Sequence, residues 1–178
     1  MAHDAGGGFV SHRKPVTADE LKRIGLFGAL STEVLDHLAT SLPIVEPDPG
    51  DLVFKEGDTA RELFVLLEGE AEVVKRSRSG VDARVAVLGP GDWFGEMGVL
   101  DVQPRSASVR ALAPSRLLRI RATDLDALYR HDLKAYALVV LNIARELSRR
   151  LRVTDGILAD FLVNVLDVVE RRQAPRAD

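Results

Sequence analysis

Short apolar runs alternate with turn residues between positions 51 and 120, and this pattern restricts the fold more than any other feature of the chain. Gly57-Asp58, Ser79-Gly80 and Pro90-Gly91 separate the runs, and such pairs are typical of tight turns between strands. Strands are predicted over residues 52–54, 63–67, 71–75, 84–88, 107–112 and 116–120. Many short strands at even spacing predict a small jelly roll made of antiparallel sheets.

Helical patterns flank this β region. Thr17 followed by Glu20 predicts a capping box, and Ser31 predicts the start of a second short helix. On the other side, Thr123 predicts the start of another helical region, which continues as a long helix from about Asp132. The chain is therefore predicted to be an α+β protein, with short N-terminal helices, an eight-stranded antiparallel β jelly roll and a long C-terminal helix.

One segment of the β region carries an acid and an arginine nine positions apart, Glu96 and Arg105, with Gly95 and Gly98 close to the acid. Glycine lets the backbone approach a ligand closely and turn its N–H groups toward an anion. The planar guanidinium of Arg105 matches two phosphate oxygens, and an ionised Glu96 accepts hydrogen bonds from sugar hydroxyls. Together these residues predict recognition of a cyclic nucleotide.

The stretch FGEMGVLDVQPRSASV resembles the phosphate-binding cassette of the cyclic nucleotide-binding domain family, which includes the bacterial catabolite activators and the regulatory subunits of cAMP-dependent kinase. Residues 49–74, PGDLVFKEGDTARELFVLLEGEAEVV, resemble the first strands of that family. The resemblance extends over residues 18–162. It implies that Glu96 binds the ribose 2′-hydroxyl, that Arg105 binds the cyclic phosphate, and that Ser106 with the Gly95–Gly98 backbone completes the site.

The resemblance places the candidate ligand-binding residues in the cassette and on the C-terminal helix. They are Gly95, Glu96, Met97, Gly98, Arg105, Ser106, Ala107 and Thr154. Thr154 is included because RRLRVT, residues 149–154, resembles the dimer helix of catabolite activators, whose matching threonine contacts the adenine amino group. Asp155 stands where that family has a serine that reaches the ligand of the other subunit.

The implied ligand is cAMP. Position 106 is a serine and not the threonine that the family resemblance associates with cGMP preference. Nevertheless, cGMP stays open as the alternative ligand.

Apolar residues recur at steps of three and four along the C-terminal helix, which is typical of a heptad seam with a partner helix. The seam comprises Ala144, Leu147, Leu151, Thr154, Leu158, Phe161, Val165 and Val168. Arg150 and Asp155 flank it at positions that pair between two parallel chains. The seam therefore predicts a homodimer. The alternative is an amphipathic helix that covers the jelly roll of its own chain.

The composition of the chain argues against several classes of function. No cysteine is present and no histidine lies between residues 38 and 130, which argues against a metal site inside the jelly roll. No nucleophile–base pair is evident, so the chain is predicted not to be an enzyme and to need no cofactor. A net charge of −3 gives no long-range attraction for DNA or for anionic membranes. No signal peptide or membrane span is recognisable, so the cytoplasm is the expected location.

The predicted organisation is a disordered tail over residues 1–15, a cyclic nucleotide-binding jelly roll with flanking helices over 16–131, a lid and dimerisation helix over 132–170, and a second disordered tail over 171–178. The predicted function is a stand-alone sensor that relays cAMP binding to an unidentified effector protein. Because few residues follow Val169, neither a helix-turn-helix module nor DNA binding by the chain itself is expected. Two alternatives stay open: a truncated or divergent regulator of the catabolite-activator type, and an interaction module with a different nucleotide ligand.

Overall fold

The computed structural model describes residues 15–101 and 103–173, with side chains described up to residue 164. The chain divides after Val140 into two compact units, and each unit is described by itself. The two predicted tails, residues 1–15 and 171–178, lie outside the described part except for Pro15 and residues 171–173. None of the described helices combines the length and the apolar composition needed to span a bilayer.

The first unit begins with three short helices: α1 (Ala18–Lys22), the 3-10 helix η1 (Gly25–Phe27) and α2 (Thr32–Ser41). The Thr17 and Ser31 side chains are confirmed as the caps of α1 and α2, although the structure shows only the Thr17 half of the predicted capping box. Thr17 Oγ1 accepts a hydrogen bond from the Glu20 amide at 3.2 Å, and Ser31 Oγ accepts one from the Val34 amide at 3.4 Å. An N-cap oxygen satisfies a donor that the first helical turn otherwise leaves unpaired.

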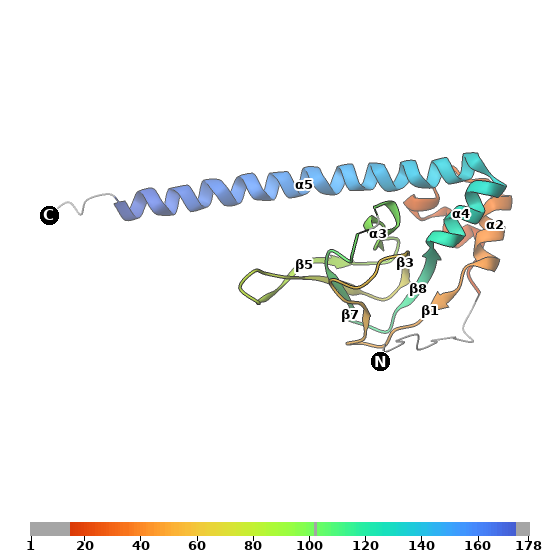
Figure 1. Ribbon diagram of the computed structural model, residues 1–178, viewed down its shortest axis with the longest axis horizontal. Helices are drawn as coiled ribbons and strands as arrows, with labels where there is room; N and C mark the ends of the chain where they lie inside the picture. The colour runs from red at the N-terminus through yellow and green to blue at the C-terminus, as the bar shows by residue number, and fades with distance from the viewer. Residues whose placement is uncertain (1–14, 102, 174–178) are drawn as a thin grey trace. The chain divides into compact units, whose positions relative to one another are not determined.

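Eight strands follow, arranged in two four-stranded antiparallel sheets (Figure 1). The first sheet has the order β1 (Ile44–Val45), β8 (Arg116–Arg121), β3 (Glu62–Glu68) and β6 (Trp93–Phe94). The second has the order β2 (Leu52–Phe54), β7 (Ser108–Ala111), β4 (Ala71–Arg76) and β5 (Asp82–Leu88). The predicted jelly roll is confirmed. All six predicted strands are present, and the two-residue strands β1 and β6 complete the eight.

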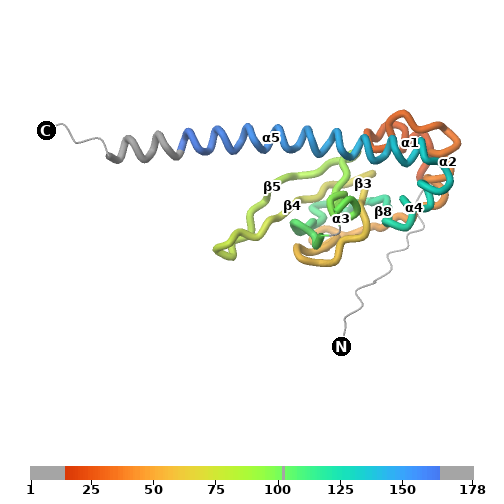
Figure 2. Tube along the Cα trace, turned by 45° about the horizontal axis from the view of Figure 1, so that its top comes forward, coloured from red at the N-terminus to blue at the C-terminus, as the bar shows by residue number. Residues whose placement is uncertain are grey.

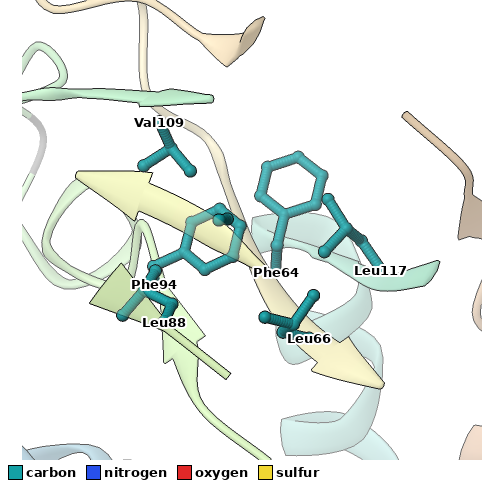
Figure 3. Close-up of a cluster of buried hydrophobic side chains, with 7 residues drawn as sticks. Phe64, Leu66, Leu88, Phe94, Val109 and Leu117 are labelled. Atoms are coloured by element: carbon teal, nitrogen blue, oxygen red, sulfur yellow. The ribbon is translucent and has the colours of Figure 1, made fainter. Parts of the chain in front are cut away.

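The core of the jelly roll is a cluster of buried apolar side chains contributed by both sheets (Figure 3). Its members are Phe64, Leu66, Phe94 and Leu117 from the first sheet, and Ala71, Leu88 and Val109 from the second. The Phe64 and Phe94 rings stack with their centroids 5.6 Å apart, and the Phe54 ring lies 5.9 Å from that of Phe94. Removal of such rings from water is a dominant favourable contribution to folding.

The first unit closes with α4 (Ala122–His131) and the first residues of α5 (Leu133–Gln173). Helices α2 and α4 lie side by side (Figures 1 and 2). The predicted cap Thr123 is wrong, because Arg121 is the N-cap and the Asp124 carboxylate accepts the Arg121 amide at 2.8 Å. A carboxylate at the third helical position can reach back to the cap amide, so it takes the place of a hydroxyl cap.

The second unit, Leu141–Asp178, contains the rest of α5 and no other element among the described residues. The long C-terminal helix is therefore confirmed (Figure 2). A single helix cannot bury an apolar stripe within itself. Among the residues whose side chains are described, 141–164, this unit holds no second element against which the predicted seam could pack.

Candidate functional site

The connection between β6 and β7, residues 95–107, holds the acid and the arginine singled out in the sequence and is called the cassette here. Gly95 follows β6 directly, Glu96 is the N-cap of the four-residue helix α3 (Met97–Leu100), and Arg105 lies three positions before β7. Glu96 and Arg105 expose only 4% and 5% of their surface. Charged side chains are rarely buried unless they have a partner, so two of them in one connection mark a candidate site.

The Arg105 guanidinium is held from three directions. Its Nη1 donates to the carbonyl oxygen of Glu62 at 2.7 Å and to that of Gly95 at 3.1 Å. Its Cζ lies 3.9 Å from the centroid of the Phe54 ring, which is a cation–π distance. The position of this guanidinium group is therefore fixed by three segments: the start of β3, the turn after β6 and the end of β2.

The other donors of Arg105 find no partner in the described part of the chain. Nε is buried without a hydrogen bond, and no carboxylate of a described residue lies within 4.0 Å of the guanidinium. Burial lowers the pKa of Arg105, whereas the carboxylates of Glu62, Asp58 and Glu96 raise it. Because little water screens a buried charge, this group interacts strongly with an anion. The Arg105 guanidinium is therefore suited to binding an anion.

Two glycines let the cassette pack closely against its neighbours. Gly95 has a φ of +83°, and a Cβ built on it would lie 2.6 Å from Arg105 Nη1. A Cβ on Gly98 would lie 2.0 Å from the Cβ of Ala60. Side chains do not approach each other so closely, so these positions require glycine. Both residues thus shape the site by packing, and the approach of their backbone to a ligand stays a prediction.

The remaining predicted residues lie either in the cassette or in the second unit. Met97 begins α3, and Ser106 Oγ donates to its sulfur at 3.8 Å. Ala107 directly precedes β7. The seven predicted cassette residues therefore lie together in the first unit. Thr154 belongs to the second unit, where its Oγ1 donates to the Arg150 carbonyl at 2.9 Å, and its contact with a base stays a prediction.

The turn between β2 and β3 lies against the cassette but is not among the predicted site residues. The Gly57 amide donates to the Arg105 carbonyl, and the Arg105 amide donates to the Asp58 carbonyl, each at 2.9 Å. Phe54, beneath the guanidinium, is also absent from the predicted set. The one signal in the sequence is the Gly57-Asp58 pair, which predicts a turn but does not reveal which distant segment the turn will contact.

Ser106 carries the single hydroxyl of the cassette, and this hydroxyl donates to a thioether instead of a base. Among the residues that the structure describes, no group of three or more histidine, aspartate or glutamate side chains could hold a metal ion.

Comparison with known proteins identifies the domain that contains the cassette. Residues 45–132 match the family model of the cyclic nucleotide-binding domain. The CRP-like cAMP-activated global transcriptional regulator of Mycobacterium tuberculosis is 30% identical over 142 residues, which are 80% of this chain and 62% of that protein. The chain therefore spans less than two thirds of that curated relative.

Two solved structures are similar over most of their own length. The N-terminal domain of a transcriptional regulator from Streptomyces coelicolor is 32% identical, with a TM-score of 0.66 over 74% of this chain and 94% of that one. A cyclic nucleotide-binding domain from Methylobacillus flagellatus is 28% identical, with a TM-score of 0.72 over 80% of this chain and 81% of that one. The similarity thus extends over nearly whole domains of these proteins.

Proposed function

This chain belongs to the cyclic nucleotide-binding domain family, and from that premise we propose that it is a sensor of cAMP. The name of the M. tuberculosis relative, a cAMP-activated regulator, supports the choice of nucleotide. The geometry around Arg105 supports the way in which the nucleotide is held. In this proposal the protein binds its ligand reversibly and does not convert it.

The buried Arg105 guanidinium is the observation that carries the proposal. A cyclic phosphate has one negative charge and two non-bridging oxygens, and a guanidinium group can meet both oxygens at once. Nη1 is already engaged by the Glu62 and Gly95 carbonyls, and Nε and Nη2 are the donors of this group that have no hydrogen-bond partner in the described part of the chain. A bound anion also offsets the free-energy cost of burying an unpaired charge.

In this proposal the other cassette residues bind the sugar and complete the contacts with the phosphate. Glu96, 4% exposed, accepts a hydrogen bond from the ribose 2′-hydroxyl. Ser106 exchanges its weak contact with the Met97 sulfur for a phosphate oxygen, which is the stronger acceptor. Glu96 and Arg105 thus recognise the two halves of the cyclic sugar phosphate from a single connection of the jelly roll.

Addition of cAMP is expected to stabilise the folded protein by mass action. At a concentration one hundredfold above the dissociation constant, the gain is about 2.7 kcal/mol, and the Tm should rise by several degrees. Differential scanning fluorimetry with cAMP, cGMP and 5′-AMP measures this gain. The open nucleotide 5′-AMP is the matched ligand control and should shift the Tm less. A constant Tm with every cyclic nucleotide at millimolar concentration contradicts the sensor function.

The same proposal gives α5 the role of dimer helix and signal relay. Its seam repeats every 3.5 residues on average, the period that suits pairing with a second copy of the helix. The second unit has no other described element to cover the seam, and the side chains of Val165 and Val168 lie outside the described part. If Thr154 contacts the base and also lies in the seam, nucleotide binding must bias helix pairing, and helix pairing must bias nucleotide affinity by the same factor.

The substitution Leu158→Asp is expected to convert a dimer into a monomer, because a seam between two helices cannot accommodate an unpaired charge. Light scattering after gel filtration measures the change, from twice 19.4 kDa to 19.4 kDa. The control Ala159→Asp adds the same charge one position away from the seam and should stay dimeric. A monomeric wild-type protein, or a dimeric Leu158→Asp variant, shows that α5 is not the dimer helix.

The receiver of the signal is proposed to be an effector protein. Two of the similar proteins described above are named as transcriptional regulators, which makes a DNA-bound output the second candidate. Sequence-selective retardation of promoter fragments by the cAMP-loaded protein favours the second candidate over the first.

A further inference from the structure

A set of polar contacts joins the turn after β2, the end of β4 and the second half of the cassette. Glu56, in the turn, accepts a hydrogen bond from Lys75 Nζ at 2.7 Å and another from the Arg76 amide at 3.0 Å. The same ammonium group donates to the carbonyl oxygen of Ser106. The Glu56 amide donates to Ser108 Oγ at 2.9 Å. Glu56 and Lys75 together are called the Lys75 clamp.

The turn that contains Glu56 also holds the residue before Ser106. The backbone of Arg105 exchanges one hydrogen bond with Gly57 and one with Asp58, each at 2.9 Å. The turn is itself closed, because the Asp58 carboxylate accepts the Lys55 amide at 2.9 Å. Arg105, Ser106 and Ser108 are therefore all anchored to one turn and one lysine.

We propose that Lys75 is a positioning residue for nucleotide binding: paired with Glu56, it holds the Ser106 carbonyl and so sets the direction of the Ser106–Ala107 peptide and of the Ser106 side chain. This inference rests on the proposed function, since it assigns Lys75 to the support of the same phosphate site. Lys75 acts through the backbone, from a strand 31 residues earlier in the chain than Ser106.

The energetics of the clamp favour a role in binding over a role in stability. The hydrogen bond from Lys75 lowers the pKa of Glu56, which favours the ionised form of the carboxylate. The Lys75 and Glu56 side chains expose 48% and 28% of their surface, and ion pairs open to solvent add little to the free energy of unfolding. Fixing a carbonyl beside the phosphate site contributes more to the affinity for the ligand, because binding groups must be held to within about half an ångström.

The variant Lys75→Met removes the ammonium group and keeps an unbranched side chain. Its dissociation constant for cAMP, measured by isothermal titration calorimetry, is expected to rise about threefold to fivefold. Lys75→Arg should restore most of the affinity, since a guanidinium can reach the same two acceptors. Arg78→Met is the matched control, because it removes the same charge from an exposed position in the turn after β4. Equal dissociation constants for Lys75→Met and Arg78→Met overturn the proposal.

Amide ¹⁵N relaxation of the ligand-free protein tests the positioning role without a nucleotide. In the wild type and in Arg78→Met, the order parameter of the Ala107 amide should stay at about 0.85, which is the value of rigid backbone. It should fall toward about 0.6 in Lys75→Met. Glu56→Gln, which keeps an acceptor but loses the charge, should show a smaller fall.

Calorimetry and amide relaxation distinguish the role of the Lys75 clamp from the proposed binding of cAMP, on which that role rests. Unchanged order parameters in both Lys75→Met and Glu56→Gln overturn the role of the clamp, whatever the protein binds. A wild-type protein with no affinity for any cyclic nucleotide overturns the proposed function instead, and the order parameters still decide whether Lys75 positions the cassette.

Discussion

The substitution Arg105→Lys is expected to weaken cAMP binding by about thirtyfold to several thousandfold, because disrupting a desolvated charge pair costs about 2–5 kcal/mol. Lysine keeps the positive charge but loses the planar fork that meets two phosphate oxygens. It also loses the stacking on Phe54 and the pair of bonds from Nη1 to the Glu62 and Gly95 carbonyls. Isothermal titration calorimetry measures the loss.

A matched control for Arg105→Lys is Arg130→Lys. Arg130 is exposed on α4, where it pairs with Asp126 at 2.6 Å, and its replacement should leave the affinity for cAMP unchanged. Circular dichroism of both variants should match that of the wild type. If Arg105→Lys binds cAMP as tightly as the wild type, the phosphate is held elsewhere, and the main support for the sensor function is lost.

The substitution Phe64→Ala is expected to lower the free energy of unfolding of the first unit by about 3–5 kcal/mol and its Tm by about 10 °C or more. The ring is 3% exposed, stacks on Phe94 and lies 6.1 Å from Phe54, so its removal leaves a cavity between the two sheets. Trp93, the single tryptophan, lies in β6 and reports unfolding of this unit by its fluorescence.

The control for Phe64→Ala is Val81→Ala, which removes apolar atoms from a side chain that is 64% exposed. This variant should stay within about 0.5 kcal/mol of the wild type. A loss below about 1 kcal/mol for Phe64→Ala would show that the sheets do not depend on this ring for their packing. Because the ring also neighbours Phe54, the affinity of the variant for cAMP reports how firmly the core supports Arg105.

The features that could be predicted from the sequence are local ones. A strand such as Leu63–Leu67 is recognisable because its apolar run ends at turn residues within the same stretch. The caps Thr17 and Ser31 are recognisable because the donor and the acceptor lie three residues apart. Strands β1 and β6 escape prediction because two residues show no periodicity.

The local signal is weaker where two residues compete for one role. Thr123 has the hydroxyl expected of a cap, yet the helix begins earlier, at Ala122, with Arg121 as its N-cap, because Asp124 reaches back to the Arg121 amide. A hydroxyl and a carboxylate can each satisfy a free amide at a helix start. Only the backbone geometry at the end of β8 decides which of them is in position.

The strand pattern, the helical flanks and the residue types of the cassette could be predicted from the sequence, since Glu96 and Arg105 lie only nine positions apart. Tertiary structure decided what surrounds Arg105: Glu62, 43 residues earlier, supplies a carbonyl, Phe54 supplies a ring, and Lys75 holds the adjoining peptide. These contacts depend on the register between strands distant in the chain. The pattern of one strand shows which of its faces is buried, but it does not show which residues of other strands will lie opposite it.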